Sequence, residues 1–131
     1  MNDIELSFPG GMRVDACIGQ WTIRTDQAKE SGGDESAPEP YQTFLASLAT
    51  CSGIYVLRYL QVRDLPTEGL RMTQRHSFNE KTHRLEEVEV DIHLPAGIPE
   101  KHRRPIERAV KLCAVKRAME DPPRFRVQLH G

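Results

Sequence analysis

The stretch PYQTFLASLATCSGIYVLRYLQV, residues 40–62, is the part of the sequence that decides the fold. Proline suits the first turn of a helix, so Pro40 predicts a helix that continues to Val62. Between Phe44 and Leu57 apolar side chains cover most of the circumference of this helix, and only small residues interrupt them. Helices of this kind are usually buried in a protein core or in a dimer interface.

Alternating apolar residues predict strands on both sides of the long helix. Before it, residues 4–25 have the period-two pattern of a short antiparallel meander, and the polar, glycine-rich segment 28–37 is expected to form a loop. After it, two strands are expected at 69–78 and 84–94, joined by a hairpin turn at 79–82. Strands joined by hairpins in this way are typical of antiparallel sheets.

A second helix and a last strand complete the expected order. Pro99 opens a helix that extends to about Glu120, with Ile106, Val110 and Cys113 on its apolar stripe. Alternation in 124–130 predicts the last strand. The order β-β-α-β-β-α-β indicates an α+β fold with antiparallel sheets and two core helices, and 131 residues suit a single domain, 1–131.

The composition narrows the functional classes. A formal charge of -1 gives no basic field for a phosphate backbone, so no nucleic-acid partner is expected. No run approaches the ~18 apolar residues of a membrane span, and the first ten residues lack the features of a signal peptide. We therefore expect a cytoplasmic protein with no membrane partner.

The chain has three cysteines, Cys17, Cys51 and Cys113, with no short spacing between any two. This pattern argues against a disulfide framework and against a zinc site, and the five histidines show no metal-binding pairing, so neither a metal nor another cofactor is expected. Cys51 lies centrally in the first helix and Cys113 on the stripe of the second. They are buried structural thiols or redox-active thiols, and the spacing alone does not distinguish these alternatives.

The sequence around the cysteines resembles the OsmC/Ohr family. Residues 40–51 match the family's pattern of a proline, a polar residue and an Ala/Leu-rich helix that reaches a cysteine eleven positions after the proline. Residues 112–118, LCAVKRA, are similar to its Cys-Pro-x-Ser-x-Ala segment, with Ala114 replacing proline. Residues 8–13 and 57–70 are also similar to family segments, in the expected order.

The resemblance implies an OsmC-like fold, an intertwined homodimer and an enzyme, a thiol-dependent peroxidase that reduces organic hydroperoxides in oxidative-stress defence. In that cycle the Cys51 thiolate becomes a sulfenic acid, Cys113 resolves it to a disulfide, and a thiol or dithiol reductant completes turnover. Cys51 lies too far into its helix for the dipole of that helix to lower its pKa, so a cation is expected to do so.

The resemblance also implies which residues support Cys51. The family uses an arginine held by a glutamate near the start of the long helix. Arg13 is the position carried over, with Arg24 as a second candidate and an ordinary exposed strand residue as the alternative for Arg13. The glutamate is replaced by Gln42, which can hydrogen-bond an arginine but carries no charge, and Glu39 is a candidate substitute.

The apolar walls of the implied substrate pocket come from Tyr41, Phe44, Leu48 and Tyr55. Because Gln42 departs from the peroxidase pattern, a second function stays open: a non-catalytic dimer that binds a small apolar ligand or acts as a slow redox sensor. Cys17 shares a strand face with Arg13 and is expected to be a bystander to this chemistry.

Overall fold

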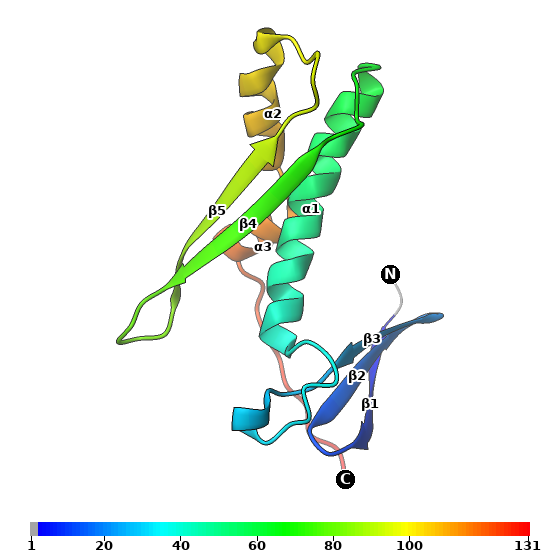
Figure 1. Cartoon of the computed structure of the whole chain (residues 1–131). Helices are drawn as coiled ribbons and strands as arrows, with labels where there is room; N and C mark the ends of the chain where they lie inside the picture. The colour runs from blue at the N-terminus through cyan, green and yellow to red at the C-terminus, as the bar shows by residue number, and fades with distance from the viewer. Residues whose placement is uncertain (1–2) are drawn as a thin grey trace. The chain divides into compact units, whose positions relative to one another are not determined.

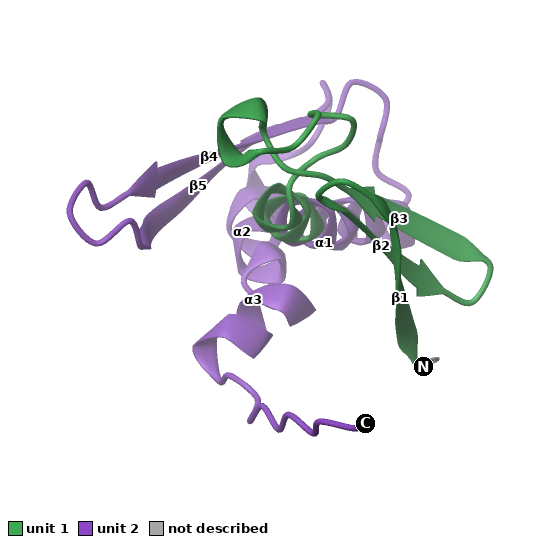
Figure 2. Cartoon of the chain, turned by 90° about the horizontal axis from the view of Figure 1, so that it is seen from below, with its two compact units in different colours: residues 1–47 green, residues 48–131 purple. Residues whose placement is uncertain are grey.

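A computed structural model describes residues 3–131 and divides the chain into two compact units, residues 1–47 and 48–131. Figure 1 shows the elements in chain order, and Figure 2 colours the two units. The boundary falls inside the long helix α1, Pro40–Val62, so that the beginning of this helix belongs to the first unit. The α+β class and the antiparallel sheets are confirmed.

The first unit contains an antiparallel sheet of three strands, in the order β1-β2-β3. The strands are β1, Ile4–Gly10, β2, Arg13–Ile18, and β3, Trp21–Thr25. The turn between β1 and β2 uses Gly10 and Gly11, both with positive φ, a conformation that glycine adopts without steric cost. The expected meander at 4–25 is therefore confirmed, although it has three strands and not two.

The register of this sheet separates its apolar and polar residues onto opposite faces. Leu6 pairs with Ala16 and Ala16 with Ile23, while Asp15 pairs with Arg24 on the other face. Directly paired residues lie on the same side of a sheet, and antiparallel sheets commonly pack one face on a core. Yet the apolar side chains are exposed, with Trp21 at 67%. This face lacks a covering layer within the described part of the chain.

The loop after β3 is held by one buried carboxylate. Asp26, only 1% exposed, accepts hydrogen bonds from the Ser36 hydroxyl at 2.6 Å, the Ser36 backbone N–H at 3.0 Å and the Gln27 backbone N–H at 2.8 Å. The loop includes a short 3-10 helix, η1, Lys29–Ser31. A Cβ at Gly33 would collide with the backbone of Gln27, so the loop folds back this closely because it has glycine there.

Asp26 should make the first unit sensitive to acid. The Ser36 hydroxyl, followed by the Ser36 and Gln27 amides, lowers the pKa of Asp26 from 3.8 to about 2. A lowered folded-state pKa stabilises the fold above the unfolded-state value, and this contribution is lost as the pH falls from about 4 to about 2. We expect Asp26→Asn to unfold at lower urea concentration at pH 7, with the difference from wild type disappearing near pH 2.

Trp21 is the chain's single tryptophan and lies on β3, so its fluorescence reports on the first unit. The exposed Asp3→Asn is the matched control and should unfold as the wild type does. Equal urea midpoints for wild type and Asp26→Asn at pH 7 would show that the Asp26 carboxylate does not stabilise the first unit.

The second unit packs a hairpin and helices against the rest of α1 (Figure 1). Strands β4, Arg71–Phe78, and β5, Leu85–His93, pair antiparallel. Asn79 closes the hairpin turn, because its Oδ1 accepts the backbone N–H groups of Lys81 at 2.9 Å and Thr82 at 2.8 Å. The hairpin and its turn therefore match the prediction.

The core of the second unit is small and centres on α1. Val56 and Leu60 of α1 are fully buried against Ile106, and partly buried apolar residues surround these three. The surrounding residues are Tyr59, Leu65, Leu70, Met72, Ile92, Leu94, Ile98 and Val110.

Helix α1 is long and apolar enough to cross a membrane by length and composition, although no segment of this kind was expected from the sequence. Core helices of soluble proteins pass the same test.

The predicted continuous helix from Pro99 to Glu120 is wrong. Its residues form a 3-10 turn, η2, Glu100–His102, then α2, Arg103–Val110, and α3, Ala114–Glu120. The break lies at Cys113, whose backbone is extended with φ -50° and ψ 126°. This conformation starts α3 in a new direction while the Cys113 side chain becomes fully buried.

The predicted last strand at 124–130 is also wrong for the single chain, where these residues have no regular structure. Phe125, Val127 and Leu129 are 89%, 90% and 98% exposed. A strand exists only beside a neighbour that satisfies its backbone hydrogen bonds, and this segment has none along the described chain. The alternating pattern is present, but the element that it would pair with is not.

Candidate active site

The two helix cysteines meet in the second unit. Cys51 lies in the middle of α1 and is half-buried, whereas Cys113, directly before α3, is fully buried. Both are free thiols, and the Cys113 thiol is hydrogen-bonded to the Cys51 sulfur. The structure thus brings together two residues that are 62 positions apart in the sequence (113 − 51).

The surroundings of Cys51 favour its thiolate. Burial alone would raise the pKa of Cys51, but hydrogen bonds from the Cys113 thiol and from the backbone N–H groups of Val115 and Ala114 outweigh it, so the pKa is lowered. Ala114 and Val115 are the first two residues of α3, where N–H groups have no partner inside the helix. Two amides and a thiol therefore lower the pKa of Cys51, an effect that was expected to come from a cation alone.

Sequence reasoning missed these amides for an identifiable reason. A continuous helix from 99 to 120 would have used the N–H groups of Ala114 and Val115 within its own backbone ladder. Only the break at Cys113 frees them, and the segment KLCAVK contains neither glycine nor proline to signal a break. Ala114, in place of the family's proline, retains an N–H that proline would lack.

Cys113 has the opposite electrostatic character. Burial, followed by its interactions with Cys51, raises the pKa of Cys113. Two thiols in contact, one with a lowered and one with a raised pKa, are suited to different roles. Cys51 can act as the nucleophile, while Cys113 stays protonated until a nearby electrophile appears.

Arg13 lies at the start of β2, in the first unit. Its Nη2 donates to Asp34 Oδ2 at 2.7 Å, its Nε donates to Ser36 Oγ at 3.1 Å, and its Nη1 donates to the Gly10 carbonyl at 3.4 Å. Arg24, the second candidate, lines the same hollow of about 360 Å³ as Arg13. Both arginines therefore belong to one polar surface of the first unit.

Gln42 has a structural contact with the backbone. Its side-chain Oε1 accepts the Glu39 backbone N–H at 2.9 Å, and the Thr43 backbone N–H donates to the Glu39 carbonyl at 3.0 Å. The first of these bonds is the glutamine half of a capping box, with Gln42 three residues after Glu39, and the second is an ordinary backbone bond of the first helical turn. The described contact of Gln42 is thus with the helix start and not with an arginine.

The expected pocket residues fall into separate groups. Tyr41 and Phe44 contact each other edge to face at 5.5 Å in the first unit. In the second unit Leu48 lines a cavity of about 540 Å³, whereas Tyr55 is half-buried elsewhere on α1. The cavity's other lining residues are Ser52, Gln74, Val88, Val90, Ile92, Glu107, Val110, Lys111, Lys116, Met119 and Glu120. Most of this wall comes from the hairpin, α2 and α3, which sequence reasoning did not connect to a pocket.

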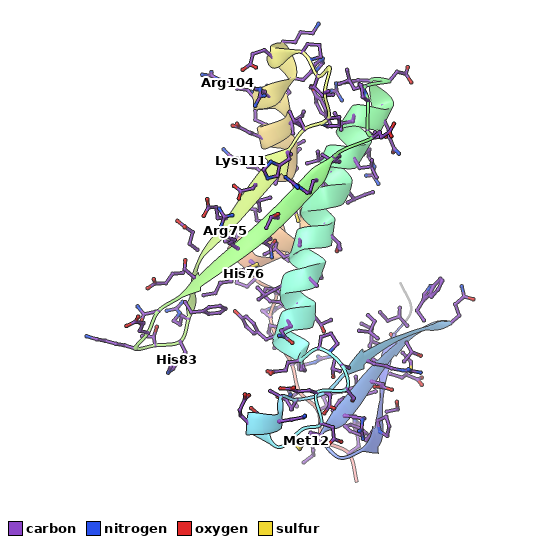
Figure 3. The ribbon with its side chains drawn as sticks, in the orientation of Figure 1. Met12, Arg75, His76, His83, Arg104 and Lys111 are labelled. Atoms are coloured by element: carbon purple, nitrogen blue, oxygen red, sulfur yellow. The ribbon has the colours of Figure 1, made fainter. Side chains whose placement is uncertain are left out.

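Cys17 and the histidines are the remaining residues that the sequence analysis considered. Cys17 lies on the polar face of the first sheet, opposite Glu5 and Thr22. In Figure 3, His83 projects from the β4–β5 turn and His76 lies farther along β4. Within residues 3–131, no group of three or more His, Cys, Asp or Glu residues is arranged to hold a metal ion.

Comparison with known proteins bears on the family and the fold. The family model described as OsmC-like protein matches residues 32–128, and curated protein sequences give no match. One similar solved structure is the OsmC like protein from Mycoplasma pneumoniae, with a TM-score of 0.73 and 17% identity, and the match covers 92% of this chain and 87% of that one. Another is a hypothetical protein from Aquifex aeolicus, with a TM-score of 0.71 and 20% identity, and the match covers 93% of this chain and 89% of that one.

A third similar structure is described as the organic hydroperoxide resistance protein OsmC from Legionella pneumophila. Its TM-score is 0.59 at 20% identity, and the match covers 91% of this chain and 90% of that one. At these identities the structures establish a shared fold, while the family model covers most of the sequence. The chain belongs to the OsmC-like protein family.

Proposed function

We propose that this protein is a thiol-dependent peroxidase that reduces organic hydroperoxides, with an oxidative-stress role. The observation that carries the proposal is the contact between Cys51 and Cys113, with the pKa of the first thiol lowered and that of the second raised. The description of a structural relative as an organic hydroperoxide resistance protein supports the same class of substrate.

The proposed cycle begins at Cys51. Its thiolate attacks the terminal oxygen of ROOH, the O–O bond breaks, and the alkoxide leaves as ROH after taking a proton. Cys51 is then a sulfenic acid, two electrons more oxidised. The Cys113 sulfur attacks the Cys51 sulfur, which releases water and forms a disulfide. A small dithiol then supplies two electrons and two protons to restore both thiols.

Two further features support an organic substrate. The cavity lined by Leu48 is mostly apolar, and an apolar wall suits an alkyl or aryl hydroperoxide better than hydrogen peroxide. Ser52, adjacent to Cys51 in sequence, lines this cavity, as does Lys116 in the first turn of α3. We propose that Tyr41, Phe44 and Tyr55 contribute further apolar surface in the assembled protein.

We propose that the working unit is a homodimer in the cytoplasm, where thiols stay reduced. The apolar face of the β1–β3 sheet and the exposed alternating segment 124–130 both lack a partner within the described chain. A second copy would supply the cover and the neighbouring strand. Light scattering should give twice the chain mass of 14.9 kDa, and Val127→Asp should shift it toward the monomer, whereas a wild-type monomer at micromolar concentration would contradict the dimer.

The peroxidase is tested by hydroperoxide consumption with dihydrolipoamide or dithiothreitol as the reductant. Cumene hydroperoxide should be consumed faster than hydrogen peroxide, because only the first can use the apolar cavity. Consumption no faster than with reductant alone would refute the enzyme and favour the second candidate, a non-catalytic ligand-binding dimer or slow redox sensor. The uncharged Gln42, which caps α1, is the observation that supports this second candidate.

A further inference from the structure

We infer that Asp34 is a positioning residue that holds the Arg13 guanidinium in one orientation, with Ser36 and buried Asp26 as its second anchor. The inference rests on the proposed function and on the family resemblance, which implies that Arg13 supports the reactive cysteine. It extends that function, because neither Asp34 nor Asp26 belongs to the long helix from which a partner for Arg13 was expected.

Arg13 contacts two different side chains of the loop through two different nitrogens. Asp34 accepts from Nη2 at 2.7 Å, while Ser36 accepts from Nε at 3.1 Å. A single exposed ion pair usually fixes little, and the Asp34 side chain is 66% exposed. Here a second, independent contact at Nε limits rotation of the guanidinium about its own stem.

The second anchor is itself rigidly held. Ser36 donates its hydroxyl to Asp26 at 2.6 Å, so the oxygen that faces Arg13 has a fixed direction. Asp26 is buried and also accepts the amides of Ser36 and Gln27. Through these hydrogen bonds the buried Asp26 carboxylate fixes Ser36, and Ser36 in turn restrains the partly exposed guanidinium of Arg13.

The charges show what Arg13 contributes. Asp34 at 2.7 Å and Asp26 at 3.9 Å surround one guanidinium, so the cluster carries no net positive charge. Arg13 then acts through directed N–H groups and not through a long-range field. Its contacts to described residues use three of its five N–H groups, which leaves one on each terminal nitrogen for a substrate oxygen.

The first test is structural and needs no activity. In the wild type, the side-chain ¹⁵Nε–¹H signal of Arg13 should be resolved and protected from solvent exchange. Asp34→Ala should move it to the position of mobile arginines and speed its exchange, and Asp34→Asn, which keeps an acceptor oxygen, should have a smaller effect. Glu30→Ala, an exposed change in the same loop, is the matched control. An unchanged signal in Asp34→Ala would overturn the inference.

The second test measures the rate at which reduced protein loses the Cys51 thiol to cumene hydroperoxide. Asp34→Ala should be slower by on the order of tenfold, because small misplacements of a positioned group are costly, and Asp34→Asn should lie between it and wild type. If the wild type reacts and Asp34→Ala matches it within about twofold, the inference fails and the peroxidase stands. If the wild type does not react, the proposed function fails, and the Nε signal still decides whether Asp34 positions Arg13.

Discussion

Cys51→Ser is expected to abolish the reaction with organic hydroperoxides, lowering the rate on the order of 10³-fold or more, as loss of a nucleophile does in other enzymes. The hydroxyl of serine is smaller than the thiol, so it should still fit beside Cys113 at the start of α3. It does not ionise at neutral pH, however, so the amides of Ala114 and Val115 would stabilise no anionic nucleophile there. The measurement is cumene hydroperoxide consumption under saturating dithiol.

Cys17→Ser is the matched control for this variant. Cys17 is half-buried on the first sheet and has no contact in the proposed chemistry, so this protein should retain the wild-type rate. Circular dichroism and thermal melting of both variants would show that each is folded. If Cys51→Ser consumed the hydroperoxide as fast as Cys17→Ser, another group would have to be the nucleophile.

Cys113→Ser is expected to separate oxidation from resolution. The serine hydroxyl can still donate to Cys51, so the first oxidation should proceed at a rate within a few-fold of wild type. No disulfide can follow, and the sulfenic acid should persist, react with dimedone and go on to the sulfinic acid under excess peroxide. Turnover with a dithiol should fall by roughly tenfold or more, because the external reductant must attack the sulfenic acid directly.

Cys113→Ala distinguishes the two roles of Cys113. Alanine removes the donor as well as the resolving sulfur, so the pKa of Cys51 should rise, and its alkylation by iodoacetamide should need a higher pH than in Cys113→Ser. Identical alkylation profiles for the two variants would show that the Cys113 thiol does not help to lower the Cys51 pKa. If dimedone formed no adduct with Cys113→Ser after oxidation, that result would argue against a sulfenic acid at Cys51.

The elements that could be predicted from sequence are those with strong local patterns. The meander at 4–25, the long helix from Pro40 and the 79–82 turn follow from periodicity and turn chemistry within each segment. The break at Cys113 could not be predicted in this way, because it reflects burial of that side chain against α1 and not a local breaker. The segment 124–130 shows the converse, since its alternation is real but a strand needs a neighbour.

The candidate site, too, could be predicted from the sequence only in part. Residues 40–51 and 112–118 identified the two cysteines through the family resemblance, but their contact depends on how α1 and α3 pack. The partners of Arg13 lie 21 and 23 positions away, in a polar loop whose sequence gives no sign of them. Gln42 was expected to serve an arginine, whereas its described contact caps the helix, which a glutamine at that position also explains.

The most direct test of the peroxidase is to count thiols after rapid mixing of reduced wild-type protein with one equivalent of cumene hydroperoxide. Three free thiols should fall to one within seconds, and peptide mapping should locate a Cys51–Cys113 disulfide with Cys17 still reduced. Three thiols that persist for many minutes, or a disulfide that involves Cys17, would contradict the account.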